Sequence, residues 1–297
     1  MANAREIQTR MHSIQDTMKI TNAMYMISSS KLKKARKMLE QTEPYFYTLQ
    51  QTIRRIVRHV PDLDHPYFSH EKHEIKGNHK KKTGYLVITA DKGMAGAYNQ
   101  NVIRLAASRL NRQEDHMLMV MGQIGRNYFE KHGMKIDEDF QYVVQDPTLG
   151  RARLISSRLV ELYNQYELDE IWMIYTKMDH SQAEADLIQL LPLKVETFQE
   201  LPAEYPHEVV EFVPSEKDVL NNIVPDYLTG LIYGGLVESY SSEQQSRMMA
   251  MEAATDSAKD MLHKLDIAYN RARQADITQE ITEVIGGARA QKAKKKH

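Results

Sequence analysis

The sequence predicts an α/β protein: a long antiparallel coiled coil of N- and C-terminal helices plus a central Rossmann-like parallel α/β domain. Both ends of the chain repeat apolar or small side chains in alternating steps of three and four residues. This is the spacing of a coiled-coil seam. Between the two ends, short apolar segments alternate with helical segments, a pattern typical of a parallel sheet with crossover helices.

The first predicted helix covers residues 1–60. At 1.5 Å per residue such a helix is roughly 85 Å long, and it needs a partner of matching length. Pro44 here and Pro225 in the C-terminal helix favour an alternative, two broken amphipathic helices folded back on a core, because an interior proline kinks or ends a helix. The seam positions are Ile7, Met11, Ile14, Met18, Thr21, Tyr25, Ser28, Leu32, Ala35, Leu39, Thr42, Phe46, Leu49, Ile53, Ile56 and Val60.

The middle of the chain is expected to form a connection, residues 61–83, and then the central α/β domain, residues 84–213. The later strands of this domain, from residue 185 to 213, should include an edge strand or a hairpin. The remaining strands are expected at 84–89, 117–121 and 171–176, with one more at 134–136 or 141–144, and the helices at 99–110, 124–131 and 147–166.

The C-terminal coiled-coil helix is predicted over residues 214–288, followed by a basic tail, residues 289–297, that we expect to be disordered. Its seam mixes apolar with small residues, which let a partner backbone approach closely. After Ala272 the apolar positions Ile277, Ile281, Val284 and Ala288 fall out of step, so this last segment should run beyond the N-terminal helix and lie against a partner protein. The seam positions are Leu220, Ile223, Tyr227, Gly230, Gly234, Val237, Ser241, Gln244, Met248, Met251, Thr255, Ala258, Leu262, Leu265, Tyr269 and Ala272.

No segment carries the full pattern of a catalytic or cofactor site. The turn from Gly93 to Gly96 follows a strand but lacks the first spacing of G-x-G-x-x-G, so a tight strand-to-helix turn explains it better than phosphate binding. Asp179, His180 and Ser181 have the residue types of a hydrolase triad, but neighbours in one loop do not point at one another. We assign no catalytic, cofactor-binding or metal-binding residue; cysteines and tight carboxylate clusters are missing around the candidate metal ligands His59, His65, His70, His73 and His79.

Composition narrows the class of protein. The chain has 39 basic and 40 acidic residues and no cysteine, which fits a reducing compartment and no polyelectrolyte partner. No apolar run approaches the roughly 20 residues of a membrane helix, and the N-terminus lacks an apolar signal core. We expect a soluble, cytoplasmic, bacterial protein that does not insert into the membrane and reaches it only through partners.

One basic segment is a candidate electrostatic contact. It places five cations in seven residues, a density that suits an acidic partner surface or a solvated helix face equally. The balanced net charge and the absence of aromatic platforms weigh against nucleic acid as the partner. The five residues are Lys31, Lys33, Lys34, Arg36 and Lys37.

Several motifs, in order along the whole chain, closely resemble the F-type ATP synthase gamma subunit family. Ala95 stands where that family often has a cysteine, and the tail 291–297 extends past the usual end of the family. The motifs are Ile20-Thr21-Asn22-Ala23-Met24, Ser30-Lys31-Leu32, the segment Asp91 to Asn99, Ser242-Glu243-Gln244, Arg247-Met248, the segment Met251 to Asp256, the segment Tyr269 to Gln274, and Ile277-Thr278-Gln279-Glu280-Ile281.

The resemblance implies a central rotor shaft inside a ring of alternating alpha and beta subunits, with the α/β domain on the epsilon subunit and the membrane ring of c subunits. ATP, ADP and Mg would bind to the partner subunits and not to this chain. Met24 would face an acidic loop of beta, while Arg273, Gln274 and Thr278 would make polar contacts to beta that form and break during rotation. A nucleotide-binding α/β enzyme that oligomerises through coiled-coil arms is the alternative that the residues leave open.

Overall fold

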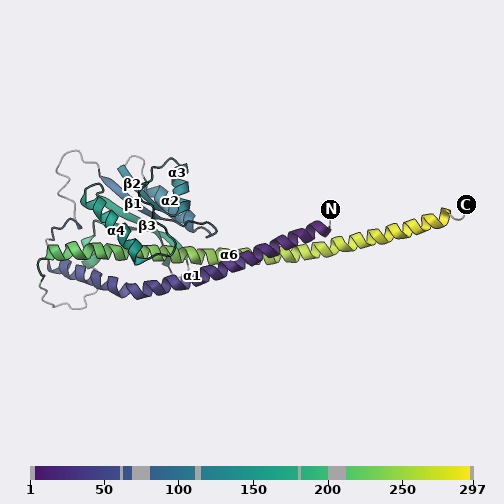
Figure 1. The fold of residues 1–297 in the computed structure, drawn as a ribbon, viewed down its shortest axis with the longest axis horizontal. Helices are drawn as coiled ribbons and strands as arrows, with labels where there is room; N and C mark the ends of the chain where they lie inside the picture. The colour runs from purple at the N-terminus through teal and green to yellow at the C-terminus, as the bar shows by residue number, and fades with distance from the viewer. Residues whose placement is uncertain are drawn as a thin grey trace. The chain divides into compact units, whose positions relative to one another are not determined.

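The computed structural model describes residues 4–60, 63–68, 81–110, 115–179, 182–199 and 212–294. The contacts between residues divide the chain into two compact units. One is Met1–Ile27 with Met248–His297, and the other is Ser28–Arg247. Two long helices contribute to both units, α1 (Ala4–His59) and α6 (Glu216–Lys294), and they are labelled in Figure 1. The predicted helices at the two ends of the chain are therefore confirmed.

In the unit formed by the two chain ends, α1 and α6 pack against each other antiparallel. The hydroxyl oxygens of Thr21 and Thr255 lie 2.7 Å apart, and both residues belong to the predicted seams. Ile7 on α1 and Met251 and Ala258 on α6 are buried as well. The seam pattern thus identified the paired face of each helix in this unit.

The last part of α6 is not paired with α1. The residues from 273 to 288 are all exposed, and α6 continues past the N-terminus of α1 in Figure 1. The prediction that the segment after Ala272 leaves its partner helix is confirmed. Helix also extends to Lys294, into the tail that we expected to be disordered, because alanine, lysine, arginine and glutamine all favour helix.

In the second unit the same two helices pair again. The ring of Phe46 lies against Gly230, at a point where any Cβ would overlap it, and its centroid is 6.4 Å from that of Tyr233. Pro44 and Pro225 both lie inside helices, so the alternative of two broken helices is wrong. Packing of the surrounding turns offsets the hydrogen bond that each proline lacks.

A four-stranded sheet in the order β2-β1-β3-β4 forms the middle of the second unit. Strand β1 pairs in parallel with β2 and β3, whereas β3 and β4 form an antiparallel hairpin with β4 at the edge of the sheet. Of the later strands expected from 185 to 213, the described residues contain β4 alone, because 195–199 is helical and 200–211 lies outside the described residues. The expected strand at 134–136 or 141–144 is wrong: the region contributes an isolated bridge, Ile136 to Leu118, and otherwise packs as irregular chain. The strands are β1 (Lys82–Ile88), β2 (Asp115–Met121), β3 (Glu170–Asp179) and β4 (Gln182–Leu191).

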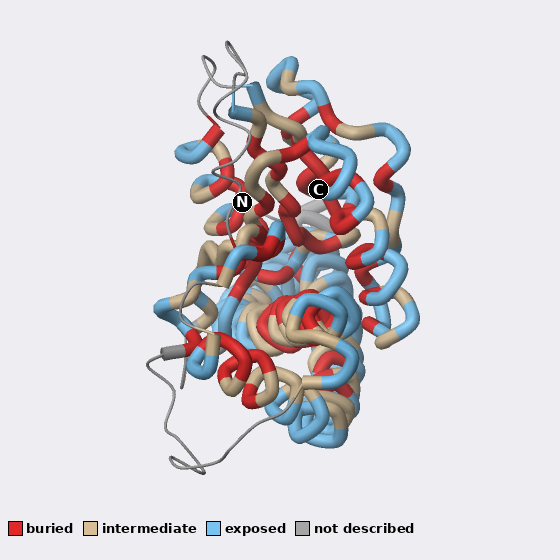
Figure 2. Tube along the Cα trace, turned by 90° about the vertical axis from the view of Figure 1, so that its left-hand side faces the viewer, coloured by how far each residue is buried: buried red, intermediate tan, exposed pale blue. Residues whose placement is uncertain are grey.

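Helices cover both faces of this sheet. Alternate residues of β1 face opposite sides, so Leu86 and Ile88 join the core shared with α1, α4 and α6, while Val87 joins the core under α2 and α3. Figure 2 shows the resulting alternation of buried and exposed stretches along the chain. These helices are α2 (Tyr98–Arg109), α3 (Gln123–Lys131) and α4 (Leu149–Asn164), and a short helix α5 (Val195–Gln199) follows β4.

Candidate functional site

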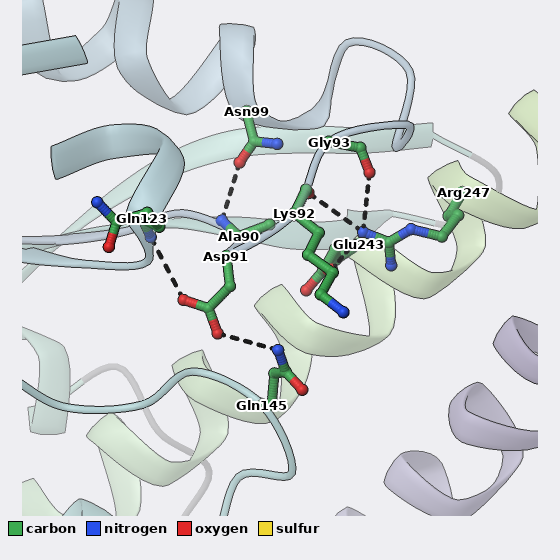
Figure 3. Close-up of polar contacts among 9 residues, drawn as sticks. All are labelled: Ala90, Asp91, Lys92, Gly93, Asn99, Gln123, Gln145, Glu243 and Arg247. Atoms are coloured by element: carbon green, nitrogen blue, oxygen red, sulfur yellow. Dashed lines mark hydrogen bonds and ion pairs between the residues drawn. The ribbon is translucent and has the colours of Figure 1, made fainter. Parts of the chain in front are cut away.

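The turn that follows β1, residues 91–96, is fastened to α6 by a buried arginine (Figure 3). The Arg247 guanidinium donates from Nη2 to Glu243 Oε1 at 2.6 Å, to the Lys92 carbonyl at 3.3 Å and to the Gly93 carbonyl at 3.3 Å. The side chains of Arg247 and Glu243 are only 10% and 8% exposed. We call these three contacts the Arg247 clamp.

Burial and the charge of Arg247 shift the pKa of Glu243 in opposite directions. Desolvation raises the pKa of the Glu243 carboxyl, and the neighbouring Arg247 lowers it by charge and by hydrogen bonding. Removing one partner of a buried ion pair leaves an uncompensated charge, which costs about 3–5 kcal/mol. The pair therefore specifies how the helix and the turn meet more than it adds stability.

The start of the turn is held to α3, to the segment before α4 and to α2. Asp91 accepts a hydrogen bond from the backbone N–H of Gln123 at 3.3 Å and another from the Gln145 amide at 3.3 Å. The Asn99 side chain accepts from the backbone N–H of Ala90 at 2.8 Å. Figure 3 shows that these contacts and the Arg247 clamp reach the turn from different elements.

The tip of the turn has an unusual backbone. Met94 has φ 62° and Gly96 has φ 53°, values in the left-handed region that a glycine adopts easily and a methionine adopts at a cost. Met94 is also 60% exposed. The clamped turn thus holds an apolar side chain out from the surface.

The clamp argues against a phosphate site at this turn. Phosphate loops direct several backbone N–H groups at the anion. Here the Lys92 and Gly93 carbonyls accept hydrogen bonds from a cation of the same chain. The turn therefore closes against α6, and it does not support the nucleotide-binding alternative.

The other candidate chemistry finds no support in the part of the chain that the structure describes. His180 and Ser181 of the triad-like sequence lie outside the described residues, as do His70, His73 and His79. Among described residues, no three His, Asp or Glu side chains gather closely enough to hold a metal ion. The helices described here also include none with the length and apolar character needed to span a bilayer.

The residues implied as contacts to beta fall in two places. Met24 is half-buried on α1, near Thr21, whose partner is Thr255. Arg273 lies 18 residues beyond Thr255 on α6, roughly 27 Å along the helix. The structure therefore does not bring Met24 together with the other three.

Arg273, Gln274 and Thr278 are neighbours on the exposed part of α6. All three side chains are exposed, and the Thr278 hydroxyl donates to the Gln274 carbonyl one turn earlier at 2.8 Å. On the same stretch of helix, Ile277 and Ile281 are 44% and 54% exposed. Polar and apolar groups of this segment both face outward, available to a partner.

Part of the basic segment contacts its own chain. Arg36 donates to the Gln245 side chain on α6 at 3.3 Å, and Lys34 lies 3.9 Å from Asp146. Lys31 is half-buried and lowers the pKa of Glu243 by its charge. Lys33, Lys34, Arg36 and Lys37 are all exposed, so these four cations remain accessible to a partner.

Sequence reasoning quoted Glu243 and Arg247 as parts of a motif but missed the clamp. An acid and a base four residues apart lie on one helix face, and here they lie on a stretch that is otherwise buried. That spacing predicts the pair. Its contact with the turn 91–96, which is more than 150 residues away in sequence, has no local signal.

Three comparisons with known proteins bear on this arrangement. A family described as ATP synthase matches residues 3–291. The ATP synthase gamma chain of Caldanaerobacter subterraneus is 42% identical over 293 residues, covering 96% of this chain and 98% of the relative. That of Acetivibrio thermocellus is 43% identical over 299 residues, covering 98% and 100%. A sodium ion specific gamma chain from Acetobacterium woodii is 33% identical, covering 97% and 98%.

Solved structures match the fold. The central stalk and c-ring structure of Tetrahymena thermophila mitochondrial ATP synthase contains a chain with a TM-score of 0.55 at 23% identity, covering 79% of this chain and 99% of that one. A chain of the Euglena gracilis mitochondrial ATP synthase also gives 0.55, at 15% identity, covering 93% and 97%.

Proposed function

This chain belongs to the ATP synthase gamma chain family, and we propose that it is the central rotor shaft of a proton-translocating F-type ATP synthase in a bacterial cell membrane. In this role it couples rotation of the membrane c ring to ATP synthesis or hydrolysis in the alpha and beta ring. The observation that carries the proposal is the antiparallel pairing of the two chain ends, from Thr21 with Thr255 to Phe46 with Gly230.

A shaft must resist twisting, and paired helices resist it better than one helix. Seam side chains of α1 pack on α6, as Thr21 does on Thr255 and Phe46 on Gly230, so torque applied to one helix passes to the other through packed contacts. The chain is a non-catalytic subunit in this account. ATP or ADP and Mg bind to the partner subunits. This chain transmits rotation to them and contributes no reacting group.

We propose that the unpaired end of α6 is the bearing inside the ring. Arg273, Gln274 and Thr278 are exposed, and they offer exchangeable polar contacts to successive beta subunits. The exposed side chains of Ile277 and Ile281 suit an apolar sleeve around the helix. Met24 on α1 is proposed to face the acidic loop of a beta subunit.

The second unit is proposed as the foot of the shaft, in contact with the epsilon subunit and the c ring at the cytoplasmic face of the membrane. The exposed cations Lys33 and Lys37 are the members of the basic segment best placed for an acidic partner. Protons are proposed as the coupling ion. That ion binds in the membrane ring, so the sodium specificity of one relative does not transfer to this chain.

Affinity purification tests the assignment. The tagged chain, expressed in its own cells, should recover alpha, beta and epsilon subunits together with ATPase activity. Arg273→Ala and Gln274→Ala should lower that activity without changing the subunits recovered, because they remove contacts made during rotation. Lys264→Ala is the matched control, an exposed cation on the paired part of α6. Recovery of the chain alone, with nucleotide bound at the turn 91–96, would support the enzyme alternative and contradict the shaft.

A further inference from the structure

We propose that Arg247 is a positioning residue for rotary coupling, because it fastens the turn 91–96 to α6 so that the turn and the helix move as one body. The proposal rests on the proposed function for its effect on coupling. The clamp itself is a structural claim that can be tested separately. None of its residues is assigned to catalysis.

The contacts of Arg247 fit a fastening role. One guanidinium nitrogen serves a carboxylate on its own helix and two successive carbonyls of the turn. Two of these three acceptors are backbone atoms, so the arginine fixes the path of the turn whatever side chains the turn carries. A guanidinium suits this task because its donors lie in a rigid plane and stay charged at any physiological pH.

The other contacts of the turn lead to different elements. Asp91 reaches α3 and the segment before α4, and Asn99 holds the end of β1. The approach of the turn to α6 is close, since a Cβ built on Gly96 would lie 3.9 Å from the Ser246 carbonyl. In the described part of the chain, the hydrogen bonds of Arg247 join the turn to this helix.

The position of Arg247 along α6 explains how the clamp could transmit force. Arg247 is the last residue of the second compact unit, and Met248 begins the other. The exposed turn, with Met94 at its tip, is therefore fixed to the helix at the residue where α6 leaves the sheet-containing unit. A force on the turn reaches α6 directly through the guanidinium.

The first readout is the mobility of the turn. Because the chain has no cysteine, Met94→Cys provides a single site for a spin label on an exposed position. In the assembled complex, Arg247→Met should increase the mobile component of the label spectrum severalfold. Arg158→Met is the matched control, because it removes an arginine from an exposed helical ion pair to Glu161 at 3.0 Å in the same unit. It should leave the spectrum unchanged.

The second readout is coupling, measured as protons pumped per ATP hydrolysed in membrane vesicles. Arg247→Met should lower this ratio severalfold while the subunit composition stays constant, and Arg158→Met should not. Arg247→Lys keeps the charge on a shorter side chain that lacks the rigid guanidinium plane, so it should fall between wild type and Arg247→Met in both readouts. If the complex with Arg247→Met does not assemble, the label spectrum and the pumping ratio of Arg247→Lys test the proposal.

An unchanged label spectrum in Arg247→Met, or in Arg247→Lys where only that variant assembles, would overturn the clamp. A mobile label with an unchanged pumping ratio would overturn its role in coupling. A wild-type complex that pumps no protons on ATP addition would count against the proposed function instead, and the label spectra would still test the clamp.

Discussion

At the scale of single residues, His65 makes the stability of the fold depend on pH. The ring is buried, only 2% exposed, and its Nδ1 accepts a hydrogen bond from the backbone N–H of Tyr67 at 3.3 Å. Burial lowers the pKa of His65 below its usual 6.5 and outweighs the hydrogen bonds to the Asn221 side chain and the Lys217 backbone, which raise it. The charge of Lys217 lowers the pKa and that of Asp64 raises it, each by less. The neutral ring is the form that the fold accepts.

The free energy of unfolding should therefore fall as the pH drops. Above the unfolded pKa of about 6.5 the ring is neutral in both states and costs nothing. Below pH 6.5 the His65 ring of the unfolded chain binds a proton more readily than that of the folded chain, so the free energy of unfolding falls. This loss ends once the pH lies below the lowered pKa of the folded state. Urea unfolding of the isolated chain over this range measures the effect. His65→Gln should flatten the pH dependence, and a slope equal to that of the unchanged chain would refute the assignment.

A lysine at position 24 tests the proposed contact of Met24 with beta. Met24→Lys places a cation beside an acidic loop, and the added attraction should hold the rotor at one angle. Protons pumped per ATP should fall, whereas assembly should be nearly normal. Met26→Lys, two residues along α1 at a side chain 72% exposed, is the control and should have a smaller effect. A normal pumping ratio in Met24→Lys would show that this contact is absent.

At the scale of elements, two glycines of α6 respond oppositely to the same change. In Gly230→Ala the new methyl group would overlap the ring of Phe46, so the helices must separate locally, at a cost of about 1–3 kcal/mol. In Gly234→Ala nothing lies within 4 Å of the new Cβ, and the loss of chain entropy in the unfolded state should stabilise by about 0.5–1 kcal/mol. Denaturant unfolding of both variants measures the difference. Equal effects would mean that Phe46 does not pack on Gly230.

The helices were the elements most open to prediction, because a seam is a local pattern. Every predicted seam position of α1 and α6 is buried or half-buried. The strand expected at 134–136 or 141–144 failed because the apolar side chains of this region, Phe140 and Val144 among them, fill the core from irregular chain. Strand order and the Arg247 clamp depend on contacts between distant segments, which a single sequence does not encode locally.

For the residues predicted to contact partner subunits, local patterns were again easier to predict than contacts between distant segments. The shift of the apolar positions after Ala272 predicted that α6 continues alone, because a helix face without a partner loses the seam spacing. The basic segment was less informative, since its charge density does not reveal that Arg36 and Lys34 turn to their own chain. Roles toward beta came from the family resemblance and stay predictions.

At the scale of the whole molecule, we propose that the two ends of one chain form a single rotating body. In the proposed function, the coiled coil passes motion from the sheet-containing unit to the alpha and beta ring. A covalent bond between two parts that rotate together should leave proton pumping unchanged. A covalent bond between two parts that move past one another should stop it.

A reversible disulfide across the seam applies this test most directly. Thr21→Cys with Thr255→Cys places two thiols where two hydroxyl oxygens now lie 2.7 Å apart, in a chain that has no other cysteine. ATP-driven proton pumping by vesicles holding the complete complex is then compared before oxidation, after oxidation and after reduction. The account predicts that the disulfide forms and that pumping is the same in all three states. Failure of the disulfide to form, or a loss of pumping on oxidation that reduction restores, would contradict it.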